Sequence, residues 1–199
     1  SLSSVAQKAP IKYGTVSMTD LELKAYLLDT SAVAAILCDY GFFSVSNYEF
    51  VRLLRIKIFK KEGTTWGNKI FPTAAKTDIR GITYNLENGE IVETKLKSES
   101  VFLERISEDL YRTRVAMPNV REGSIIDLEF RHPWLPAEWR FQDIIPVRWS
   151  ELTIPNSKYI DFRKNYFGFL PLTENSSSHS LAKDMPAFKE EPYMTNATN

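Results

Sequence analysis

The amino-acid sequence predicts a mainly β protein, an antiparallel β-sandwich-like domain with one or two short helices. Short segments alternate between apolar and polar side chains, which is strand periodicity. Turn residues separate these segments, most clearly at Asn88 and Gly89. Of the 199 residues, 43% are hydrophobic and 25% are charged, a balance typical of a folded globular domain. The chain is therefore expected to bury one sizeable core.

The first predicted element is a short helix. Residues 1–16 show no strong periodicity and are expected to form an N-terminal arm. Thr19 and Glu22 fit a capping box, in which Thr19 accepts from a backbone amide and Glu22 reaches back. Apolar residues follow at helical spacing, so we expect a helix of about two turns.

Two strands are predicted next. The run 33–37 has no polar member, which is typical of a strand buried on both faces, although periodicity alone does not distinguish it from a buried helical turn. Gly41 is expected to end this run. In the segment 50–59, Leu54, Ile56 and Ile58 share one face of the predicted strand, and Phe59 lies on the other. The basic residues of this segment are expected on the solvated face: Arg52, Arg55 and Lys57.

Two antiparallel pairs are predicted in the middle of the chain. Segments 82–86 and 91–96 alternate on either side of Asn88-Gly89, which predicts a hairpin with a type I′ turn. Segments 110–115 and 124–130 are expected to pair in the same way. Asp127 and Glu129 would then face the solvent.

The C-terminal third contains irregular segments. The loop 132–139 has two prolines and cannot be a central strand, whereas 141–154 returns to strand character, with Pro146 suggesting an edge or a bulge. From residue 173 the sequence becomes polar. We therefore expect a β-sandwich-like accessory domain over 17–172 and an extended tail or linker over 173–199, leading toward a further C-terminal region.

Charge and cysteine content narrow the classes of partner. The chain has 25 basic and 25 acidic residues, so no net field favours nucleic acid or an anionic membrane. No apolar stretch is long enough to span a membrane. Cys38 is the only cysteine, which excludes an intrachain disulfide, and it lies in an apolar run where a buried, inert thiol is expected.

The sequence predicts no catalytic residues, no metal site and no cofactor. Cys38 lies at the end of an apolar run, and the only histidines, His132 and His179, lie in separate loops, which does not favour a Cys-His-Asp triad. Two histidines 47 positions apart do not suggest a zinc site. Asp127 and Glu129 suit a solvated strand face better than a glycosidase pair. A hydrolase that uses His132 with nearby carboxylates is a remaining alternative.

Tryptophans are the candidate binding residues. Trp134 and Trp139 lie in the proline-bearing loop, and Trp66 lies in an irregular segment. Their rings could stack on sugar rings or peptide side chains, which makes a glycan-binding module an alternative function. The competing interpretation is that they cap an open end of the sheet core.

Several strings of the sequence resemble one known family. They are residues 20–34, 84–96, 117–126, 145–151 and 186–194, and they occur in order over about residues 17–194. The chain resembles the domain of unknown function that precedes a transglutaminase-like domain in bacterial envelope proteins.

This resemblance implies an all-β, non-catalytic accessory domain that serves recognition or acts as a spacer. It also implies a location in the periplasm or on the cell surface. The partner would be a transglutaminase-like, cysteine-peptidase-like domain of the same protein, with a peptide or glycan as a further ligand. The family has no established catalytic residues in this part, so none is carried over.

Overall fold

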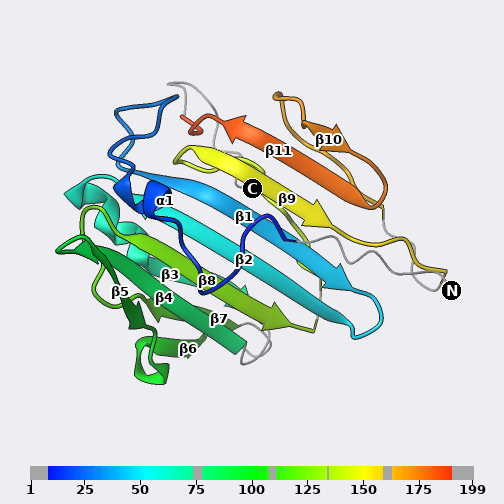
Figure 1. The fold of residues 1–199 in the computed structure, drawn as a ribbon. Coiled ribbons are helices and arrows are strands. Elements are labelled where there is room, and N and C mark those ends of the chain that lie inside the picture. Colours follow the sequence, from blue (N-terminus) through cyan, green and yellow to red (C-terminus); the bar gives the residue numbers. More distant parts are fainter. Residues whose placement is uncertain (1–8, 74–77, 108–110, 134, 159–162, 190–199) are drawn as a thin grey trace, which may run out of the picture.

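The computed structural model describes residues 9–73, 78–107, 111–133, 135–158 and 163–189. Its strands form two sheets, and the described residues include three short helical segments (Figure 1). The helices are α1 (Met18–Glu22), η1 (Lys61–Gly67) and η2 (Ser98–Ser100). The strands are β1 (Ala34–Ser44), β2 (Glu49–Ile58), β3 (Asn68–Thr73), β4 (Asp78–Glu87), β5 (Glu90–Lys95), β6 (Val101–Arg105), β7 (Tyr111–Ala116), β8 (Ile125–His132), β9 (Val147–Thr153), β10 (Glu174–Asn175) and β11 (His179–Met185).

The two sheets differ in size. The large sheet has the order β10-β11-β9-β1-β2-β8-β4-β5, and the small sheet has the order β3-β7-β6. Among the described strands, neighbours are antiparallel except for β1 and β9, which run parallel. This architecture confirms the predicted mainly β, sandwich-like fold with few short helices.

The main core fills the space between the two sheets. Leu54, Ile56 and Ile58 of β2 lie on this face, as their spacing predicts, and are almost fully buried. They belong to the same apolar cluster as Val115 of β7. Phe71 of β3 adds a ring contact with a residue of β8, with centroids 4.3 Å apart. Stacked sheets pack about 10 Å apart, so these side chains close the gap.

The opposite face of the large sheet is also covered, which corrects the sequence analysis. Arg55, Lys57, Asp127 and Glu129, expected in solvent, are at most 6% exposed. The reason is the N-terminal segment 9–23, which crosses this face in front of the central strands (Figure 1). Strand alternation identifies the two faces of a sheet but does not show that a distant segment covers the second one.

Charged side chains hold the N-terminal segment to the sheet. Arg55 pairs with Asp127 at 2.6 Å and donates to the carbonyl of Thr15, also at 2.6 Å. Lys57 donates to the carbonyls of Leu21 and Gly123, each at 2.6 Å. The expected N-terminal arm is thus, over its described residues, a packed part of the domain.

Helix α1 is shorter than predicted and has a different cap. Ser17, not Thr19, is the N-cap, and its side chain accepts from the amide of Asp20 at 3.0 Å. The helix ends at Glu22. Leu21 is its one buried residue, and this contact with the sheet fixes the position of the helix.

Two strand predictions have opposite outcomes. The hairpin of β4 and β5 is confirmed, with Asn88 at φ 52° and Gly89 at φ 83°, as a type I′ turn requires. The second predicted pair is wrong, because β7 pairs with β3 and β6 in the small sheet, while β8 pairs with β2 and β4 in the large one. The connection between β7 and β8 therefore crosses from sheet to sheet.

Strand β1 continues through Gly41 to Ser44, so Gly41 does not end it. A Cβ at Gly41 would come within 2.6 Å of the Trp139 ring and 2.8 Å of the Phe50 ring. The glycine is therefore needed for the close approach of two aromatic rings and not for a turn.

The C-terminal region joins the large sheet over part of its expected tail. Strand β11 pairs with β9, and β10 pairs with β11, so residues 174–185 are not an extended linker. Pro146 comes just before β9, which lies inside the sheet between β1 and β11. Residues 190–199 lie outside the described part. No described helix is long and apolar enough to cross a membrane.

Candidate recognition site

A cavity of about 400 Å³ lies beside β9 and β11, between two loops. The loop 135–142 lines one side, and residues 163–170 line the other. Its remaining lining includes Leu152 of β9 and Ser180 of β11. Ligand sites are typically concave and combine apolar walls with polar groups that fix the orientation of the ligand, and both kinds of group line this cavity.

Trp139, one of the three predicted binding residues, lines this cavity. Its indole nitrogen donates to the Ser150 hydroxyl at 3.1 Å, and the Arg52 guanidinium lies 4.7 Å from its ring centroid. Arg52 is itself fixed by a two-point ion pair with Asp39, at 2.7 and 2.6 Å. The ring is thus half-buried and held by neighbours on several sides.

The structure does not bring the other predicted tryptophans into this site. Trp66 lies on η1, where it packs against the core and carries the Lys69 ammonium 3.8 Å from its ring centroid. Trp134 lies outside the described residues. Trp149 also has a cation over its ring, Lys183 at 4.5 Å. Each described tryptophan therefore already makes a cation–π contact within the chain.

Two phenylalanines at the cavity mouth were not singled out by the sequence analysis. Phe167 is 89% exposed and Phe169 is 100% exposed, and both line the cavity. A cluster of aromatic residues in this part of the sequence was the available signal. Since large apolar side chains next to a pocket are typical of binding surfaces, these two residues are the best-exposed contacts of the site.

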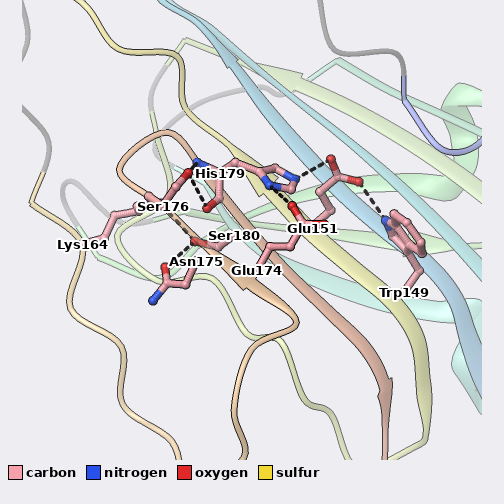
Figure 2. A network of polar contacts seen from close by, with 8 residues as sticks. All are labelled: Trp149, Glu151, Lys164, Glu174, Asn175, Ser176, His179 and Ser180. Carbon is pink, nitrogen blue, oxygen red and sulfur yellow. Dashed lines mark hydrogen bonds and ion pairs between the residues drawn. The ribbon is translucent and has the colours of Figure 1, made fainter.

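One corner of the cavity is polar (Figure 2). The Lys164 ammonium donates to the carbonyl of Ser176 at 2.5 Å and to the Ser180 hydroxyl at 3.0 Å. The Ser180 hydroxyl in turn donates to the side-chain oxygen of Asn175 at 3.1 Å. Partial burial lowers the pKa of Lys164 below its usual range.

On the other side of β11, His179 lies between two carboxylates (Figure 2). One ring nitrogen is 3.0 Å from Glu151, and the other is 3.2 Å from Glu174. The second oxygen of Glu151 accepts from the Trp149 indole at 2.8 Å. The arrangement ties β10 and β11 to β9.

The residues weighed for catalysis lie on separate elements. Cys38 lies on β1, His132 at the end of β8 and His179 on β11. Cys38 is 1% exposed, and burial raises the pKa of its thiol above the ordinary value. Among the described residues, no group of three His, Cys, Asp or Glu side chains is arranged to hold a metal ion.

Comparison with known proteins shows a likeness in fold alone. No protein-family description matches the sequence, and no curated protein matches it. A crystal structure from Parabacteroides distasonis, described as a "putative protease", is similar in fold, with a TM-score of 0.58 at 12% identity. The likeness covers 82% of this chain and 38% of that protein. This chain thus has the fold of a part, less than half, of a longer protein.

Proposed function

We propose that this chain is a non-catalytic recognition domain of a larger bacterial envelope protein, located in the periplasm or at the cell surface. A transglutaminase-like or peptidase-like domain would carry the chemistry elsewhere in that protein. The observation that carries the proposal is the aromatic-lined cavity with Phe167 and Phe169 exposed at its mouth.

The proposed modular role is supported by two independent likenesses. The strings of sequence over residues 17–194 resemble a domain that precedes a transglutaminase-like domain. The fold is similar to part of a longer crystal structure, of which it covers 38%. A domain that makes up a minor part of a larger chain suits recognition, positioning or spacing.

The non-catalytic part of the proposal rests on how the reactive groups are held. Ser180 is 3% exposed, receives a hydrogen bond from Lys164 and donates its own proton to Asn175. A serine nucleophile would instead donate to a general base. The ring nitrogens of His179 both face carboxylates. These groups stabilise the β10–β11 edge.

The proposed ligand is a polypeptide rather than a glycan. Sugar rings stack on free aromatic faces, whereas Trp139 and Trp66 already carry cations over their rings. Phe167 and Phe169 are exposed, but phenylalanine has no polar atom to bond to sugar hydroxyls. Apolar peptide side chains match them better.

Binding and turnover assays of the isolated chain test this function. We expect fluorescein-labelled peptides with apolar residues to bind, and we expect no cleavage or transfer of any of them. The double variant Phe167→Ser/Phe169→Ser should weaken binding at least about tenfold, because central aromatic contacts dominate interfaces. The matched control is Leu27→Ser/Leu28→Ser, at residues 88% and 68% exposed but outside the cavity.

Two results would contradict the proposal. Peptide turnover that disappears in Ser180→Ala would make the chain an enzyme. Glycan binding that is lost in Trp139→Ala, with no peptide bound, would replace peptide recognition by sugar recognition.

A further inference from the structure

We infer that the cavity binds the C-terminal end of a polypeptide, with Lys164 contacting the terminal carboxylate and the aromatic loops holding the last apolar side chain. This inference rests on the proposed recognition function and adds the chemistry of the ligand. Three features of the described residues carry it: the charge of the lining, the position of Lys164, and the size of the cavity.

The charged lining favours an anion. Arg140, Arg163 and Lys164 line the cavity, with Glu138 as the acidic residue of the same lining. Glu138 is already paired with Arg140 at 3.0 Å. Among the described residues, Arg163 and Lys164 form no ion pair with a carboxylate. Two cations at the cavity are thus left for a negatively charged ligand.

Lys164 is oriented by two hydrogen bonds and keeps further donor capacity. Its ammonium has three donors, and the bonds to Ser176 and Ser180 account for two of them. Since Lys164 lines the cavity, the third donor is left for an oxygen of a bound ligand. An ammonium held by two hydrogen bonds loses little conformational entropy when it binds a carboxylate. Its fixed position also selects where the carboxylate can bind.

The volume suits one large side chain with a short stretch of backbone. About 400 Å³ lies at the lower end of the range for ligand pockets, roughly 300–1,000 Å³. The aromatic walls contributed by Trp139 and Tyr166 surround this space, and Phe167 and Phe169 extend it outward. An apolar side chain can enter while its carboxylate lies at the polar corner. A peptide end offers both groups together.

The test uses one peptide in two forms with the complete 199-residue chain. A fluorescein-labelled hexapeptide ending in Leu-Phe is titrated as the free acid and as the C-terminal amide, by fluorescence anisotropy. We expect the acid to bind about tenfold or more tightly, since one hydrogen bond to a charged group is worth roughly that factor. Lys164→Met should bring the two affinities within about twofold.

Two further variants separate charge from structure. Lys164→Arg keeps the cation and should retain most of the preference for the acid. Lys61→Met removes an exposed lysine outside the cavity and should leave both affinities unchanged. Far-ultraviolet circular dichroism of each variant confirms that it is folded. Raising the salt concentration should weaken binding of the acid more than that of the amide.

Four outcomes would overturn the inference. Equal affinity for the acid and the amide would contradict the proposed contact with the carboxylate, but it would be compatible with peptide recognition. A preference for the acid that persists in Lys164→Met would place the anion elsewhere. Displacement of the peptide by dodecanoate at equal concentration would indicate a fatty-acid site. Absence of binding by either peptide would contradict the proposed function as well.

Discussion

Arg55 and Asp127 form a two-point ion pair across β2 and β8, with nitrogen–oxygen distances of 2.6 and 2.7 Å and side chains only 4% and 2% exposed. The same guanidinium holds the carbonyl of Thr15 in the N-terminal segment. This pair is therefore the point at which the covering segment, β2 and β8 are joined.

Removal of Arg55 should be strongly destabilising. Arg55→Met leaves the Asp127 carboxylate buried without its cation, and such breaks cost about 3–5 kcal/mol. Urea denaturation of the variant measures the loss. Lys61→Met, at an exposed residue, should change the free energy of unfolding by less than about 0.5 kcal/mol. The double variant Arg55→Met/Asp127→Leu should recover part of the loss, and no recovery would contradict the ion-pair explanation.

Lys57 should make stability rise with pH in the alkaline range. Burial lowers its pKa from 10.5 to about 8, and its side chain is fully buried. Below pH 8 Lys57 is protonated in both the folded and the unfolded chain, so its contribution to the free energy of unfolding does not change with pH. Between pH 8 and 10.5 the unfolded chain binds more protons, so the free energy of unfolding increases, by up to about 3 kcal/mol.

The difference between the wild type and Lys57→Met isolates this effect. Tyr26 and Tyr40, whose pKa values burial raises to about 12, act in the opposite direction above their unfolded value of 10.0, but they do so in both proteins. Urea titrations of the two proteins from pH 7 to pH 10 therefore suffice. A difference that stays flat over this range would show that Lys57 does not titrate there.

Gly41→Ala should disturb the Trp139 ring. The added methyl group would lie 2.6 Å from this ring and 2.8 Å from the Phe50 ring, so one of them must move. Overpacking of this kind costs about 1–3 kcal/mol. Urea denaturation gives the cost, and a change in tryptophan fluorescence that is absent in the Trp139→Ala background reports the displacement of this ring. The cost should be smaller in a Trp139→Ala background, and an equal cost in both backgrounds would contradict the steric explanation.

His179→Ala should loosen the β10–β11 edge. The change removes one partner of the Glu151 carboxylate, whose side chain is 4% exposed, at a cost of about 1–3 kcal/mol. Glu174 is 58% exposed, so Glu174→Gln should cost less than about 0.5 kcal/mol. Hydrogen exchange at the β11 amides checks the local effect. Unchanged exchange rates in His179→Ala would mean that the imidazole does not hold this edge.

The sequence predicted the fold class because alternation and turn chemistry are local. The hairpin at Asn88 and Gly89 follows from two adjacent residues that adopt positive φ. The burial of Arg55 and Asp127 could not be predicted, since it depends on a segment that lies about 40 residues from Arg55 in the chain. The partners of β7 and β8 were missed for a similar reason, because alternation does not specify which sheet a strand joins.

The candidate site was only partly predictable. Trp139 was singled out from its loop and lines the cavity. The polar corner joins Lys164 to Ser180, from a loop and a strand that were expected to belong to different parts of the protein. Because the polar composition of residues 173–199 predicted a tail, the sequence could not predict a site to which β11 contributes.

The parallel pairing of β1 with β9 has a consequence for how the molecule folds. It joins Ile36 to Val147, residues separated by more than half of the chain, whereas the hairpins join near neighbours. Contacts between residues distant in the chain form slowly, because the entropy of closing a long loop is lost before the contacts stabilise the structure. Strands β9 and β11, which contribute to the lining of the cavity, should therefore be added after the central hairpins. The proposed peptide-binding site would then be completed in the last stage of folding.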